Sequence, residues 1–267
     1  MVWIDTHCHL NAEPFSGKVS QIVDTARKNG VSHILIPAVD TASFTDVHHI
    51  AHAIDGCSYA LGIHPLYVLQ SPESDLDVLA QWVDEKRSDD CFAAIGEIGL
   101  DFYLPERCTP AAREKQEYFF CRQLEIARQY DLPVLLHTLR SVDTVLKFLR
   151  QYGVKRGIAH AFNGSMQQAQ AYIHQGFKIS FCGTVTYERA KQRRTLAKEL
   201  PIDAIVVETD APDLPPYWKG KRENSPAELP RIAETVAGLR GVSPAYLAEW
   251  TSRNAVSAIP RLADRVR

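Results

Sequence analysis

Two histidines separated by one residue, His7 and His9, follow a short apolar stretch at residues 2–4 that predicts a buried strand. Side chains on a strand alternate between its two faces, so we expect both imidazoles on one side and Cys8 on the other. Two neighbouring imidazoles are suited to bind one metal ion. Because a single His-x-His pair is common without a metal, the hypothesis depends on ligand-type residues at the ends of other strands.

Such residues do recur near the ends of later apolar runs. They are His64, Glu97, His137, His160 and Asp210. Leaving His64 aside, four histidines and two carboxylates exceed the needs of one tetrahedral site, and they suit two metals about 3.5–4 Å apart. Water shared by two metals becomes a nucleophile near neutral pH. The residues therefore predict a hydrolase that uses a metal-activated water.

The order of the strands suggests how these ligands divide between the two metals. His7, His9 and Asp210 come from the first and last strands, which become neighbours if the sheet closes, and we expect them to hold one metal. His137 and His160 come from adjacent strands and are expected to hold the other. Glu97, which lies centrally in the strand order, has two carboxylate oxygens and is the predicted bridge between both metals.

Catalytic roles follow from the same placement. We predict that Asp210 orients the nucleophilic water or accepts its proton, so Asp210 and Glu97 are the expected catalytic residues. By alternation, Glu208 lies on the same face as Asp210, where we expect it to orient a ligand or a substrate base. His64 is predicted to contact the substrate phosphate, because six other residues already fill the two metal sites.

Eight apolar runs alternate with amphipathic helical runs along the chain. The expected strands are residues 2–4, 33–39, 59–64, 92–100, 133–137, 157–162, 177–181 and 204–210. Nearly continuous apolar strands between helices indicate a parallel sheet, and eight such units predict a (β/α)₈ TIM barrel with its active site at the C-terminal ends of the strands. The alternative, an open doubly wound sheet, is less favoured because no glycine-rich turn follows the first strand.

The amino-acid composition limits the classes of protein to which this chain can belong. With 45% hydrophobic and 23% charged residues, the chain has the composition of a globular protein, and we expect one domain over residues 1–267. No apolar run approaches ~18 residues and no signal-peptide pattern opens the chain, so we expect no membrane span. Six scattered cysteines without a CxxC pair predict a reduced, cytoplasmic protein. No obligate protein partner is evident.

Several motifs together resemble one known family. They are His7-Cys8-His9, Gly62-Ile63-His64-Pro65, the GEIGLD run at residues 96–101, His137, His160 and the ETDAP run at residues 208–212. These are similar to the motifs of the TatD family of metal-dependent hydrolases, most closely its YjjV-like bacterial branch. The resemblance covers nearly the whole chain. It implies a barrel related to amidohydrolases and a Mg-dependent, 3′-exonuclease-like deoxyribonuclease.

The resemblance also implies a division of the ligands. It places His7, His9, Glu97 and Asp210 at one metal, and Glu97, His137 and His160 at the other. The family description implies Mg²⁺, whereas four imidazole ligands favour softer ions such as Mn, Zn, Co or Ni. We therefore expect two divalent metal ions per chain, with Mg²⁺ favoured by the family and a softer ion by the ligands.

Two places depart from the family pattern, and both concern substrate contacts. The arginine that often follows the fifth-strand histidine by two residues is displaced by one, to Arg140. The loop at residues 211–226 lacks the usual Arg-Asn-Glu-Pro order and reads Lys-Arg-Glu-Asn-Ser-Pro from Lys221. We predict Arg140 and Arg222 as substrate contacts beside His64. The basic run at residues 189–194 could also support phosphate binding, but we favour its interpretation as a solvated helix face.

Three functions remain open at this point. The first is a phosphodiesterase acting on DNA, and the resemblance implies action at single-stranded or 3′ ends. A net charge of −2 disfavours tight binding along duplex DNA. Basic loops and helix N-termini at the same end of the barrel favour phosphate. The second is an amidohydrolase-like lactonase, esterase or amidase acting on a small molecule. The third is a non-catalytic barrel that uses its metals structurally.

Overall fold

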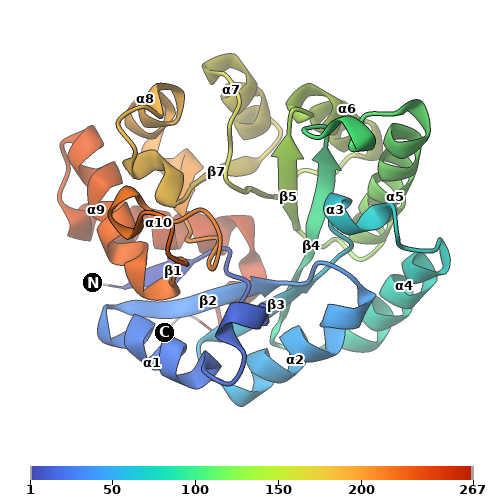
Figure 1. The fold of residues 1–267 in the computed structure, drawn as a ribbon, viewed down its shortest axis with the longest axis horizontal. Helices are drawn as coiled ribbons and strands as arrows, with labels where there is room; N and C mark the ends of the chain where they lie inside the picture. The colour runs from blue at the N-terminus through green and yellow to red at the C-terminus, as the bar shows by residue number, and fades with distance from the viewer. Residues whose placement is uncertain (1, 266–267) are drawn as a thin grey trace.

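The computed structural model of the chain describes residues 2–265, and it contains one sheet of eight parallel strands paired in sequence order. These are β1 (Trp3–Asp5), β2 (Val31–Pro37), β3 (Cys57–Leu61), β4 (Phe92–Asp101), β5 (Val134–Leu139), β6 (Gly157–Ala159), β7 (Phe177–Phe181) and β8 (Ile205–Val207). Figure 1 shows the strands at the centre with helices around them. The prediction of a (β/α)₈ barrel is confirmed.

The barrel is closed by backbone hydrogen bonds between the segments that follow β1 and β8. The Thr6 amide donates to the Val207 carbonyl at 3.3 Å, and the Asp210 amide donates to the His7 carbonyl at 2.8 Å. The His9 amide donates to the Ala211 carbonyl, also at 2.8 Å. The two segments therefore run side by side, and the expected neighbourhood of the first and last strands exists in the folded chain.

The helices surround this sheet and begin and end at recognisable signals. They are α1 (Val19–Lys28), α2 (Phe44–Ala53), α3 (Pro65–Val68), α4 (Ser74–Lys86), α5 (Pro110–Gln129), α6 (Val142–Tyr152), α7 (Met166–His174), α8 (Lys191–Glu199), α9 (Leu229–Arg240) and α10 (Pro244–Ala258). Thr109 caps α5 by accepting from the Ala112 amide, and Gly153 ends α6 in the left-handed conformation. The helical periodicity of the sequence is thus matched by local capping residues.

Both faces of each strand are buried, which explains the nearly continuous apolar runs. In β2, Ile34 and Ile36 belong to the core between sheet and helices, whereas Leu35 belongs to the barrel interior. The interior core also includes Ile259 and Leu262, which follow α10. The end of the chain therefore contributes apolar side chains to the inside of the barrel.

Several strand ends differ from the prediction. The third, sixth and eighth strands stop at Leu61, Ala159 and Val207, and Glu97 and His137 lie inside β4 and β5 instead of at their ends. After each shortened strand only isolated ladder bonds continue, such as His160 N to Leu136 O at 3.0 Å. The polar residues that follow these strands leave the sheet and lie at the mouth of the barrel.

The alternation argument for Glu208 and Asp210 therefore used the wrong local structure. Both residues lie beyond β8, and Asp210 has a left-handed backbone with φ of 59°. Asp tolerates this region better than most residues. Within residues 2–265 no helix is long and apolar enough to cross a membrane, and the six cysteines are free thiols.

Candidate metal centre

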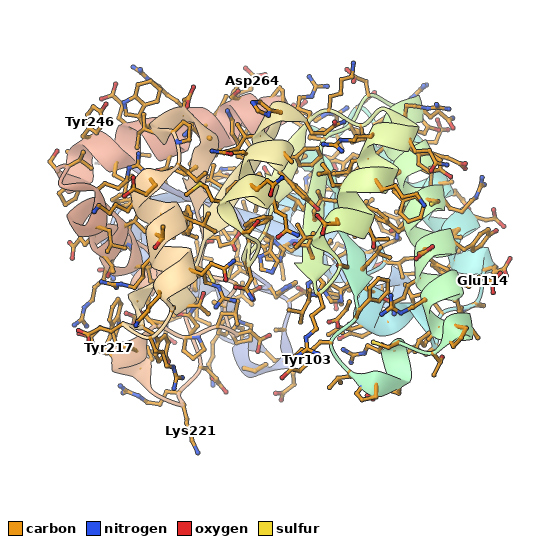
Figure 2. The ribbon with its side chains drawn as sticks, turned by 90° about the horizontal axis from the view of Figure 1, so that it is seen from above. Tyr103, Glu114, Tyr217, Lys221, Tyr246 and Asp264 are labelled. Atoms are coloured by element: carbon orange, nitrogen blue, oxygen red, sulfur yellow. The ribbon has the colours of Figure 1, made fainter. Side chains whose placement is uncertain are left out.

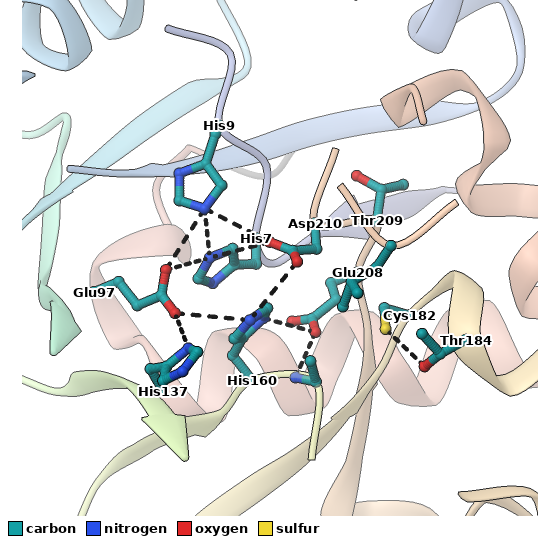
Figure 3. A network of polar contacts seen from close by, with 12 residues as sticks. His7, His9, Glu97, His137, His160, Cys182, Thr184, Glu208, Thr209 and Asp210 are labelled. Carbon is teal, nitrogen blue, oxygen red and sulfur yellow. Dashed lines mark hydrogen bonds and ion pairs between the residues drawn. The ribbon is translucent and has the colours of Figure 1, made fainter. Parts of the chain in front are cut away.

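Side chains from β1, β4, β5, β6 and β8, or from the segments that directly follow them, meet at the C-terminal mouth of the barrel (Figure 3). They include all six predicted ligands, namely His7, His9, Glu97, His137, His160 and Asp210. Glu97 is the member that contacts the most of the others, and its side chain is only 2% exposed. The centre is therefore organised around one buried carboxylate.

Close packing of β4 against β5 fixes the position of Glu97. A Cβ atom at Gly96 would lie 2.6 Å from the Cβ of Leu135, and one at Gly99 would lie 1.9 Å from the carbonyl oxygen of His137. Only glycine fits at these two positions, because any side chain would push the strands apart. The glycines of the GEIGLD run thus allow the strand approach that brings Glu97 beside His137.

One oxygen of Glu97 faces the histidines that follow β1. Its Oε2 atom lies 3.0 Å from Nε2 of His7 and 3.5 Å from Nε2 of His9. These two imidazole nitrogens are 3.3 Å apart. Asp210 Oδ1 lies 3.5 Å from His9 Nε2 and 3.7 Å from His7 Nε2. Two nitrogens and two carboxylate oxygens therefore converge on one point, as the ligands of a metal do.

The other oxygen of Glu97 faces a different set of histidines. Its Oε1 atom lies 3.1 Å from His137 Nδ1, 3.3 Å from His64 Nε2 and 3.7 Å from His160 Nε2. Ligand atoms of His64, Glu97 and His137 lie within 4.8 Å of one another, and so do those of His7, His160 and Asp210. His64, predicted as a substrate contact, is thus at the edge of the ligand cluster.

Two histidines are held by carboxylates on the side away from Glu97. The Nδ1 atom of His160 lies 2.9 Å from Glu208 Oε1, an oxygen that also accepts from the Ala161 amide. The Nε2 atom of His137 lies 3.3 Å from Asp101 Oδ2. A carboxylate that accepts from one imidazole nitrogen leaves the other nitrogen free to bind a metal. Glu208 thus contacts the candidate ligand His160.

Asp101 was missed as a site residue by the sequence analysis. It ends β4 and is 2% exposed, and its Oδ1 accepts from the Tyr103 amide at 2.9 Å. A signal did exist, because Asp101 is the last residue of the GEIGLD run. Asp5 was missed too: it accepts from both the amide and the hydroxyl of Thr209, at 2.9 and 2.5 Å, which locks the segment before Asp210 to the end of β1.

The electrostatics of the cluster favour positive charge. Burial by itself lowers the pKa of His160, but the nearby carboxylates of Glu208, Asp210 and Glu97 raise it to about 10. Burial raises the pKa of Glu97, yet His64, His7 and His160 hold it well below its ordinary value. An environment that stabilises a proton on a buried imidazole also stabilises a cation. Donor atoms and charge therefore fit divalent metal ions.

A cavity of about 810 Å³ opens beside this centre. Besides the ligands, its wall includes apolar side chains and four carboxylates that are not part of the cluster, namely Glu13, Asp40, Asp46 and Asp213. Arg193 also lines the cavity, so its interpretation as part of a solvated helix face was wrong. It is the single lysine or arginine among the described residues of this wall.

The arginines predicted as substrate contacts lie outside the cavity wall. The Arg140 guanidinium is 4.7 Å from the centre of the Tyr103 ring, and the exposed Arg222 donates to the Lys219 carbonyl at 3.2 Å. Figure 2 shows Lys221, from the same loop as Arg222, extending outward from the edge of the molecule where Tyr103 also lies. These basic residues border the mouth instead of facing the candidate ligands.

Comparison with known proteins agrees with this geometry. The family model described as TatD related DNase matches residues 4–259. A Haemophilus influenzae protein named as an uncharacterized metal-dependent hydrolase is 36% identical, over 96% of this chain and 98% of that protein. The mouse putative deoxyribonuclease TATDN3 is 30% identical, over 97% of this chain and 88% of that protein. The crystal structure of Escherichia coli YjjV, 33% identical, superposes with a TM-score of 0.90 over 97% of this chain and 98% of that one.

Proposed function

This chain belongs to the TatD family of metal-dependent hydrolases, and on that basis we propose that it is a two-metal phosphodiesterase acting on single-stranded or 3′ ends of DNA. The observation that carries the proposal is the position of Glu97, whose two oxygens face two different groups of histidines. Its Oε2 side, with His7, His9 and Asp210, would hold one metal. Its Oε1 side, with His137 and His160, would hold the other.

The protonation pattern of the ligands supports this assignment. With Nδ1 of His160 donating to Glu208 and Nε2 of His137 donating to Asp101, each ring would present its other nitrogen, directed at Glu97, to a metal that displaces the second proton. Bound divalent ions would supply Lewis-acid activation of water and of a phosphoryl oxygen. Their ligand set, rich in imidazole, favours Mn, Zn, Co or Ni over Mg²⁺.

Asp210 is the residue we propose as the proton acceptor. Its side chain is 10% exposed and lines the cavity, whereas Glu97 is nearly fully buried. Burial raises the pKa of Asp210, but His160, His9 and His7 more than compensate and hold it below its ordinary value. The carboxylate is therefore ionised at neutral pH and is placed to orient the attacking water and to accept its proton.

The hydrogen bonds of His64 support a role in contacting substrate. Its Nδ1 accepts from the Leu66 amide at 3.1 Å, so the proton of the neutral ring is on Nε2. That Nε2–H points toward Glu97 and His137 and is a donor, whereas a ligand to a metal needs a free lone pair. Burial lowers the pKa of His64 to about 4, so the ring is neutral and offers this single N–H to a phosphoryl oxygen.

The shape and charge of the cavity bear on the substrate. A volume of about 810 Å³ accommodates a nucleotide or two, and its carboxylates would repel a long polyanion running across it. The name of the mouse relative, a putative deoxyribonuclease, supports DNA as the polymer. A strand end that enters the cavity fits these observations better than a duplex bound along its length.

The same acidic and partly apolar wall also favours a second candidate, hydrolysis of an ester or lactone of a small molecule. The two functions are separated by testing protein loaded with Mg, Mn, Co, Ni or Zn against 5′-labelled single-stranded DNA and against a panel of esters and lactones. Stepwise release of nucleotides is the expected result. Turnover of the ester panel without nucleotide release under any metal would replace the phosphodiesterase with the second candidate.

A further inference from the structure

Arg193 lies in the first turn of α8 and is the single lysine or arginine in the described cavity wall. The residues on either side of it are fixed to neighbouring backbone. Gln192 donates to the Gly164 carbonyl at 2.6 Å, and Arg194 donates to the Val185 carbonyl at 3.2 Å. These two bonds hold the first turn of α8 against the loops that follow β6 and β7, and so fix the backbone from which Arg193 extends.

The guanidinium of Arg193 is not used within the protein. Over residues 2–265 it makes no ion pair and no hydrogen bond, and its Nε atom is buried without a partner. A buried N–H group without an acceptor costs free energy that an incoming acceptor recovers. A planar, always charged fork of donors is best matched by a carboxylate or phosphate. Arg193 therefore has the properties of a binding residue for an anion.

Four carboxylates in the rest of the cavity wall disfavour binding of an anion beside them. Glu13 follows β1, Asp40 and Asp46 follow β2, and Asp213 follows β8. Arg193 comes from a different element, α8 between β7 and β8, whose first turn contacts the loop after β6 through Gln192. An anionic substrate therefore finds favourable charge at the metal centre and at Arg193, and unfavourable charge along the wall made by the four carboxylates.

We propose that Arg193 binds a second anionic group of the substrate, the phosphate next to the one that is cleaved. This inference rests on the proposed phosphodiesterase function and narrows its substrate to a strand end that places two neighbouring phosphates in the cavity. The cleaved phosphate lies at the metals, its neighbour lies on Arg193, and the base and sugar face the carboxylates. A third phosphate has no favourable position inside the cavity, which makes the enzyme selective for ends.

The test compares two nucleotides that differ by one phosphate. Binding of thymidine 3′,5′-bisphosphate and of thymidine 3′-monophosphate to the metal-loaded protein is measured by titration calorimetry. We expect the bisphosphate to bind about 10-fold tighter or more, because a charge-assisted hydrogen bond is lost without it. Arg193→Gln should abolish this ratio, and Arg193→Lys should restore it in part. Lys191→Gln, which removes an exposed charge from the same helical turn outside the cavity, should leave it unchanged.

The outcomes separate this inference from the proposed function. Equal affinities for the two nucleotides in the wild-type protein, or the same ratio in Arg193→Gln, would overturn the anion site. If the ratio depends on Arg193 but no DNA is hydrolysed, the anion site stands and the phosphodiesterase proposal fails. If DNA is hydrolysed and Arg193→Gln binds both nucleotides as the wild type does, only the anion site is lost.

A second cluster of ligand-type side chains lies on the outside of the barrel, at the start of β4. His48 and His52 are four residues apart on α2 and face Asp89, which precedes β4. The Nε2 atom of His52 lies 2.9 Å and that of His48 lies 3.7 Å from Asp89 Oδ2, and the three ligand atoms are within 4.8 Å of one another. Two histidines at this helical spacing present both rings on one face, which suits a metal.

The acidic member of this cluster is already held in place. Asp89 Oδ1 accepts from the Cys91 amide at 2.8 Å, and its Oδ2 accepts from the Tyr59 hydroxyl at 2.7 Å. The His48 ring lies against Tyr59 and Trp82. Asp89 and His48 therefore have little conformational freedom left to lose on binding, and two imidazoles with one carboxylate suit Zn²⁺. We infer that His48, His52 and Asp89 form a separate zinc site that ties α2 to the start of β4.

This inference does not depend on the main centre. Zinc content after dialysis against buffered Zn²⁺ is measured together with the melting temperature, for wild type, His52→Gln and His49→Gln. His49 is not a member of this ligand group and is a matched control on the same helix. We expect His52→Gln to hold one zinc fewer per chain and to lose part of the zinc-induced rise in melting temperature. Equal zinc content in all three proteins would overturn the site.

Discussion

Replacing Asp210 by asparagine tests the proposed proton acceptor with little disturbance of the fold. Asparagine has the same size and adopts the left-handed backbone that Asp210 requires, at φ of 59°. The backbone hydrogen bond from residue 210 to the His7 carbonyl does not involve the side chain and is kept. The substitution removes the negative charge and most of the basicity, and it leaves one amide oxygen near His7 and His9.

The expected loss follows from what the structure assigns to this carboxylate. Its Oδ1 lies 3.5 and 3.7 Å from the imidazole nitrogens of His9 and His7, so it is one of four converging ligand atoms on that side. Glu97 and both histidines remain, so much of the metal should be retained at saturating concentration. General-base catalysis contributes about 10²–10⁴-fold. We expect turnover to fall by that factor, which corresponds to about 3–5 kcal/mol in the barrier.

The assay measures metal content and the initial rate of nucleotide release on the same preparation. Glu223→Gln is the matched control, because Glu223 is in the same loop at residues 211–226, is exposed and is not part of the cavity wall. The control should stay close to the wild-type rate. Asp210→Asn with both metals bound and near-wild-type turnover would refute the reasoning, and another group would have to accept the proton.

Three further predictions concern other residues. Glu97→Ala should lower the content of both metals, whereas His160→Ala should mainly empty one site; two metals retained per chain without Glu97 would remove its bridging role. His64→Gln should keep the metals and raise KM or lower kcat, and loss of metal would make His64 a ligand instead. Burial lowers the pKa of His33 from 6.5 to about 3. As the pH falls below 6.5, His33 therefore binds a proton in the unfolded chain but not in the folded protein. Stability should therefore drop between pH 7 and pH 5 by about 2 kcal/mol, and His33→Gln, measured by urea unfolding, should remove that part of the drop; an unchanged drop would refute it.

The barrel could be predicted from the sequence because its evidence is local. Apolar runs of strand length alternate with amphipathic runs of helix length eight times, and each run carries its own periodicity and capping residues. Parallel strands buried on both faces, such as β2 with Ile34 outside and Leu35 inside, need no information from distant residues to be recognised. The candidate ligands were found in the same way, since they directly follow or interrupt these runs.

The geometry of the site was decided by contacts that join residues far apart in the chain. Glu208 and Asp210 lie beyond β8, so strand alternation says nothing about where they point; the bonds of Thr209 to Asp5 place them instead. Asp101 pairs with His137 only because glycines let β4 and β5 approach. Loop side chains have no periodicity to follow, and their directions are set by tertiary hydrogen bonds.

Charge shows the same division between sequence and tertiary structure. Composition established that this chain has a net charge of −2, because charges can be counted without knowing the fold. Which of its basic residues faces the substrate depends on the fold. Arg140 and Arg222, near the predicted motifs, lie outside the cavity, while Arg193, in a run typical of a solvated helix, lines it because Gln192 and Arg194 anchor that turn of α8 to neighbouring carbonyls.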